Sequence, residues 1–70
     1  MSRHPKYSGM TVDERLFVAG KRDRFDAAAR KGDRQQMIRI LLDVELSNSQ
    51  AAETADAILA DPGQYGYEST

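Results

Sequence analysis

Two short amphipathic segments joined by a tight connector constrain this fold more than any other feature of the sequence. Residues 34–44 carry the most apolar helical face of the chain: Met37, Ile38, Ile40, Leu41, Leu42 and Val44. Residues 48–60 carry a second face with smaller side chains: Ala51, Ala52, Ala55, Ile58 and Leu59. Asp33 and Ser47 stand at the N-terminal cap positions, and each is followed three residues later by a Gln. The sequence therefore predicts two capped helices that form a corner about Leu46, with the first helix at the centre of the core.

The segment before them, residues 12–31, is predicted to form one longer helix. Thr11 and Glu14 form a capping box at its start, and Gly32 fits a left-handed C-terminal cap at its end. Gly20 lies near the middle, where a Gly costs about 1 kcal/mol relative to Ala, and the apolar residues change face there. We therefore expect a helix that either bends at Gly20 or touches neighbours on two sides.

The expected fold class is all-α: a small three-helix domain over residues 11–61, with a helix-turn-helix-like corner between the second and third helices. Residues 1–10 contain Pro5 and Gly9 and no apolar period, which predicts a flexible N-terminal segment. Pro62 ends the last helix and begins a C-terminal tail over 62–70. Tyr65 and Tyr67 are the large side chains of that tail, and they either pack over the Ala-rich helix or act as a recognition element.

Length and composition limit the kinds of functional site that the chain can form. The 70 residues include no Cys and one His, which argues against disulfides, thiol catalysis and a bound metal or cofactor. We expect no catalytic residues, because acids that cap helices are mostly structural and so short a chain has little volume for a pocket. No apolar run approaches about 18 residues and no secretory signal is present, so a soluble, cytoplasmic protein away from membranes is expected. A core this small also favours a second subunit, and we expect a homodimer.

Charge is distributed unevenly along the chain. All ten Lys and Arg residues lie at or before Arg39, whereas residues 40–70 contain six acids and no basic residue. The first part also contains five acids, so it carries +5, and the six later acids bring the net charge to -1. The basic cluster of residues 21–39 is the candidate site for an anionic partner: Lys21, Arg22, Arg24, Arg30, Lys31, Arg34 and Arg39. Three interpretations remain: a basic first helix against an acidic third, head-to-tail self-association, and an anionic ligand on the basic half.

Residues 37–59 resemble a helix-turn-helix, and also the helical opening of histone-like DNA-bending proteins in which a Leu-Ser turn links two helices. The second helix departs from that pattern. Glu53, Asp56 and Asp61 stand where a recognition helix needs groups that attract phosphates and base edges. We therefore interpret the likeness as a shared way of turning between two helices.

The chain from residue 10 to residue 67 is similar to a family of short, uncharacterised bacterial helical proteins. The stretches that carry this resemblance are residues 11–20, 25–28, 44–47, 55–62 and 65–67. The resemblance implies a small stand-alone bacterial protein and brings no activity or site with it.

These features favour a non-enzymatic protein-interaction module or accessory regulator that self-associates. Phe17, Tyr65 and Tyr67 are its candidate contact residues. The alternative is a nucleic-acid-binding regulator that uses the basic cluster of residues 21–39.

Overall fold

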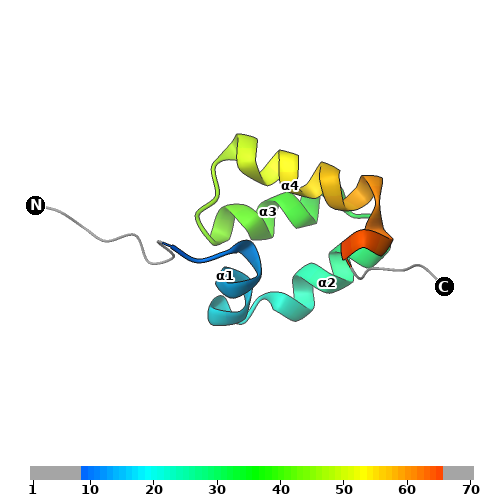
Figure 1. The fold of residues 1–70 in the computed structure, drawn as a ribbon. Coiled ribbons are helices and arrows are strands. Elements are labelled where there is room, and N and C mark those ends of the chain that lie inside the picture. The colour runs from blue at the N-terminus through cyan, green and yellow to red at the C-terminus, as the bar shows by residue number, and fades with distance from the viewer. Residues whose placement is uncertain (1–8, 66–70) are drawn as a thin grey trace, which may run out of the picture.

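The structure is a computed structural model that describes residues 9–65 (Figure 1). Four α-helices follow one another in this range: α1 Val12–Ala19, α2 Arg22–Lys31, α3 Arg34–Asp43 and α4 Asn48–Ala60. A short 3₁₀ helix, η1 Pro62–Tyr65, comes after them. The all-α class is confirmed for these residues, which include no strand. Residues 1–8 of the flexible segment predicted over residues 1–10, and Tyr67 of the tail, lie outside the described residues.

The single helix predicted over residues 12–31 is wrong, and so is the count of three helices, because the chain breaks at Gly20. Gly20 has φ 71° and ψ 26°, a left-handed conformation that Gly adopts without a side-chain penalty. Its amide donates to the Phe17 carbonyl at 3.1 Å, and the Lys21 amide donates to the Leu16 carbonyl at 2.9 Å. This is the Schellman arrangement that closes helix C-termini. Gly32 repeats it at the end of α2 with φ 72°.

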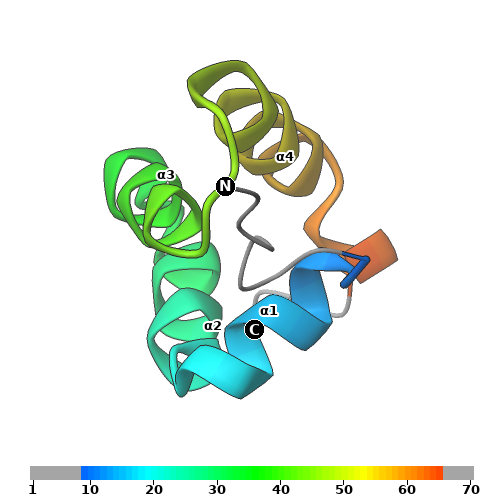
Figure 2. The ribbon, with the colours of Figure 1, turned by 90° about the vertical axis from the view of Figure 1, so that its left-hand side faces the viewer.

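The predicted corner between the next two helices is not confirmed. α3 and α4 lie side by side and run in roughly opposite directions (Figure 1, Figure 2), and they make the most extensive helix–helix contact among the described elements. Glu45 carries the chain through the reversal with φ 71°, and the Leu46 amide donates to the Leu41 carbonyl at 3.2 Å. Ser47 then caps α4 in a capping box with Gln50, as predicted.

The core draws on all four helices and on the α3–α4 connector. Its buried members are Leu16, Phe25, Ala28, Ala29, Met37, Ile40, Leu41, Val44, Leu46, Ala51, Ala55 and Ile58. The central place predicted for α3 is confirmed, but Leu42 is 38% exposed and Ile38 is only half-buried. Adjacent helical residues point about 100° apart, so Leu42 turns towards solvent when Leu41 turns inwards.

Polar contacts hold α1 against the end of α3. The Arg15 side chain donates from Nε to the Met10 carbonyl and from Nη1 to the Val44 carbonyl, both at 3.2 Å. Lys21 Nζ lies 3.8 Å from Asp43 Oδ2. Seen nearly along α3 and α4, α1 stands across from α4, with α2 and α3 on the other side (Figure 2). This placement leaves α4 with one flank on α3 and another facing α1.

Candidate functional site

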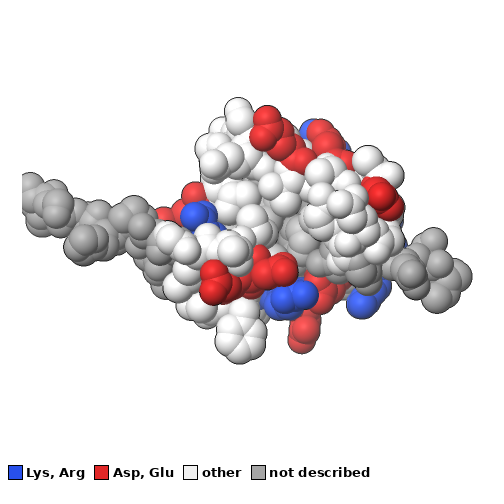
Figure 3. Space-filling model, viewed as in Figure 1, with Lys and Arg blue, Asp and Glu red and all other residues white. Residues whose placement is uncertain are grey.

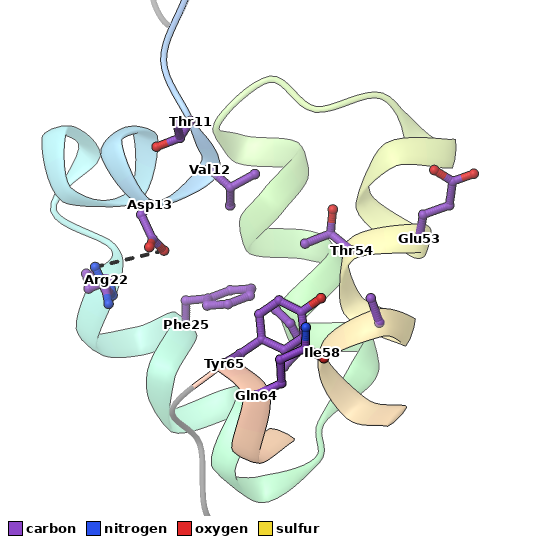
Figure 4. A pocket seen from close by; sticks show the side chains of 11 residues that line it. Thr11, Val12, Asp13, Arg22, Phe25, Glu53, Thr54, Ile58, Gln64 and Tyr65 are labelled. Atoms are coloured by element: carbon purple, nitrogen blue, oxygen red, sulfur yellow. Dashed lines mark ion pairs between the residues drawn. The ribbon is translucent and has the colours of Figure 1, made fainter. Parts of the chain in front are cut away.

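A groove opens between the starts of α1 and α2, the middle of α4, and η1 (Figure 4). Its volume is about 650 Å³, which is within the usual range of ligand-binding clefts. Its lining residues are Thr11, Val12, Asp13, Arg22, Phe25, Glu53, Thr54, Ala57, Ile58, Gln64 and Tyr65. The expectation that so short a chain has little volume for a pocket is therefore wrong.

Helix geometry places the apolar floor of this groove. Phe25 from α2 and Ile58 from α4 are almost fully buried, and both reach it. Along α4, Glu53, Thr54, Ala57 and Ile58 recur at spacings of three and four residues, so they share one flank of the helix. The same apolar face that fills the core thus continues to a surface open to solvent.

Tyr65 closes the groove from the η1 side. Pro62 cannot continue α4, and the chain turns into η1 with the Gln64 amide donating to the Asp61 carbonyl at 3.1 Å. The Tyr65 ring extends into the groove on the side of Phe25 (Figure 4) and remains 46% exposed. Tyr65 is thus the one predicted contact residue that lines the groove among those the structure describes. Phe17, on α1, is 77% exposed and does not line it.

Charged side chains lie at the rim of the groove. Arg22 Nη1 lies 3.9 Å from Asp13 Oδ1, and Arg22 Nε lies 3.4 Å from Asp26 Oδ1. Glu53 forms no ion pair with any residue in the described range. Asp and Glu side chains are spread over the face seen in Figure 3, where Lys and Arg are fewer. The carboxylate of Glu53 is therefore the lining charge left available to a partner.

A smaller cavity of about 270 Å³ continues the groove towards the start of α4. Both cavities are lined by Thr11, Val12, Glu53 and Thr54. The smaller one adds Met10, Arg15, Leu46 and Gln50. Together the two cavities form one elongated surface along α4, which we call the α4 groove.

The seven residues of the predicted basic cluster are not gathered in one place. Arg34 pairs with Asp56 of α4 through two bonds, Nε to Oδ1 at 2.6 Å and Nη2 to Oδ2 at 3.4 Å. Lys21 pairs with Asp43, and Arg22 lies at the rim of the α4 groove. The other four are exposed and form no ion pair with a described residue: Arg24, Arg30, Lys31 and Arg39.

The Arg34–Asp56 contact shifts the pKa of both side chains. The hydrogen bond from Arg34 holds the pKa of the Asp56 carboxyl below its usual value, although partial desolvation opposes the shift. The same bond, helped by the attraction between the two charges, raises the pKa of Arg34. Both side chains are exposed, so the contact fastens α3 to α4 at the surface.

Most of the α4 groove was missed by sequence reasoning. Ile58 was expected only as an apolar helix position, Glu53 only as an acid that argues against DNA recognition, and Thr54 carried no signal of its own. The signal that could have located the groove was Gly20. Interpreted as a C-terminal cap, it turns α1 away from the α2 axis and places the start of α1 opposite α4.

Among residues 9–65, no group of three or more His, Cys, Asp or Glu side chains could hold a metal ion. No helix in that range is long and apolar enough to cross a membrane. No family model matches the chain, and no curated protein or solved structure matches it either.

Proposed function

We propose that this protein is a non-enzymatic interaction module and that the α4 groove is its binding surface. The observation that carries the proposal is an open groove of about 650 Å³ in which Val12, Ala57 and Tyr65 present apolar surface to solvent above a buried floor of Phe25 and Ile58. Exposed apolar surface of this kind, rimmed by polar groups, is typical of interaction sites.

The character of the surface favours a protein as the partner. Tyr65 stands half-exposed at one edge, and aromatic side chains are enriched at protein interfaces. The groove is also open along α4 and lies between helices, the kind of place where a peptide segment docks. Self-association and a cytoplasmic location remain parts of the proposal, the former supported by the exposure of Phe17 and Val18 on α1.

A photo-crosslinking pair tests this function. Ala57 is exposed and lines the groove, whereas Ala27 is exposed on α2 and does not line it. We expect Ala57→p-benzoylphenylalanine to give a protein adduct in cells, and Ala27→p-benzoylphenylalanine to give none.

The adduct must then be identified and its partner purified. That partner should bind the wild type and should not bind the Thr54→Trp variant, in which a larger side chain fills the groove. Equal adducts from positions 57 and 27, or binding that survives Thr54→Trp, would rule the groove out as the interaction surface.

A nucleic-acid-binding regulator is the second candidate, favoured by the four exposed basic residues without described ion pairs. Arg24 and Lys31 stand seven residues apart on α2 and so share one stripe of the helix. Duplex DNA should then bind most tightly at low salt, because binding releases counterions. No binding at about 50 mM salt would remove this candidate.

A further inference from the structure

We infer that the occupant of the α4 groove is an amphipathic helix with Lys or Arg beside its apolar stripe. This inference rests on the proposed function, since it names the chemistry of the partner that the groove receives.

The shape of the groove is the first support. The two cavities meet at Val12, Thr54 and Glu53, so they form one surface rather than two separate pits. The lining residues of α4 run from Gln50 to Ile58, about 12 Å at 1.5 Å per residue. That length matches two turns of a helix lying along α4, whereas a compact small molecule would fill only one of the cavities.

The apolar residues supply the second support. Phe25 and Ile58 form the floor at one end, and Leu46 lies at the other end, with Val12 between them. Phe25, Ile58 and Leu46 are buried and Val12 is half-buried, so a partner must insert side chains between the rims, where they would contact mainly Val12 and Tyr65 above that floor. An amphipathic helix does this with residues three or four positions apart.

The charge expected on the partner helix follows from which charged side chains of the groove already have partners within the protein. Arg15 donates to the Met10 and Val44 carbonyls, and Arg22 lies between Asp13 and Asp26. Glu53 lines both cavities and has no ion-pair partner in the described range. Its carboxylate extends outward from α4, away from the floor of the groove (Figure 4), so a basic residue at the flank of the partner helix would meet it at the rim. An acidic one would meet no available cation there.

Two labelled peptides test the inference by fluorescence anisotropy with the full chain. Both are 14-residue helices with the same Leu stripe, and they carry either Lys or Glu beside it. We expect the Lys peptide to bind about three- to fivefold more tightly than the Glu peptide, the scale of one exposed ion pair. Glu53→Lys should abolish or reverse this preference.

Asp23→Lys is the matched control, because Asp23 is exposed on α2, does not line the groove, and changes the net charge equally. It should keep the preference for the Lys peptide. Three results overturn the inference: a Glu peptide that binds as well as the Lys peptide, equal effects of Glu53→Lys and Asp23→Lys, or no binding of either peptide at millimolar concentration. The crosslinking result from position 57 does not depend on any of these three results, so the proposed function can hold even if this inference fails.

Discussion

Leu41 and Leu42 are neighbours in the chain with opposite environments. Leu41 is fully buried, and Leu42 is 38% exposed. Leu41→Ala removes a packed side chain and leaves a cavity, which should lower the free energy of unfolding by about 2–5 kcal/mol. Leu42→Ala should cost less than about 1 kcal/mol. Urea denaturation followed by circular dichroism at 222 nm measures both, and equal losses would contradict the packing of α3 described above.

Substitution of Gly20 by Ala distinguishes a helix break from a continuous helix, because the two predict stability changes of opposite sign. The Gly20 φ of 71° is unfavourable for any residue with a Cβ, although nothing stands within 4 Å of where that Cβ would lie. Gly20→Ala should therefore destabilise the protein by about 1–2 kcal/mol. In one continuous helix over residues 12–31, the same change would instead stabilise it by about 1 kcal/mol.

Gly63→Ala is the control for that substitution. Gly63 does not have a positive φ, and a Cβ there would make only an ordinary contact with Asp61. The free energy of unfolding of the Gly63→Ala variant should stay within about 0.5 kcal/mol of the wild-type value. A stabilising Gly20→Ala in urea denaturation would contradict the break between α1 and α2.

At the scale of the elements, the helix starts could be predicted because caps are local. Thr11, Asp33 and Ser47 each accept a hydrogen bond from the amide three residues on, as the sequence indicated. The break at Gly20 could not be predicted from local pattern, since a Gly suits a bend, a helix crossing or a cap. Packing decides it: Leu16 and Phe25 are nine residues apart, and one continuous helix would point them about 180° apart. The break lets both enter the same core.

The α3–α4 pair should show a pH dependence through Arg34 and Asp56. The pKa of Asp56 is lowered from 3.8 by its bond to Arg34, so the ionised carboxylate stabilises the fold above that value. The contribution is lost as the pH falls through the lowered pKa, because protonation then breaks the ion pair. Asp56→Asn should therefore lower Tm slightly at pH 7 and leave it unchanged near about pH 2. A Tm difference that is the same at both pH values would show that the ion pair is not its cause.

At the scale of the whole molecule, the uneven charge of the chain is partly explained by contacts within it. Lys21 pairs with Asp43, and Arg34 pairs with Asp56, so two bases of the first part meet acids of the second. The two pairs join the basic and acidic parts of the chain, but neither joins the predicted first helix to the predicted third, because Asp43 and Arg34 both lie on α3. The basic residues of the 21–39 cluster lie apart because residues adjacent in sequence point to different sides of their helices. Their acidic partners lie on other parts of the chain that come close only in the folded protein.

The α4 groove could not be predicted for a related reason. Its walls come from residues 11–13, 22–25, 53–58 and 64–65, which belong to four different helical elements and come together only in the folded chain. The short chain predicted little volume for a pocket. The groove instead lies between elements, where its volume depends on how α1 is turned at Gly20 rather than on how much interior the chain can enclose.

Self-association is the last property to be tested at this scale. Phe17 and Val18 on α1 are 77% and 53% exposed, but two side chains cover far less than the roughly 800 Å² per partner of a standard interface. We therefore expect a weak dimer, with a sedimentation mass near 7.8 kDa at about 10 µM that rises towards twice that value at about 1 mM. The double substitution Phe17→Ser and Val18→Ser should hold the mass at 7.8 kDa throughout, whereas Leu42→Ser should not. A wild type that stays at 7.8 kDa even at 1 mM would remove self-association from the proposed function.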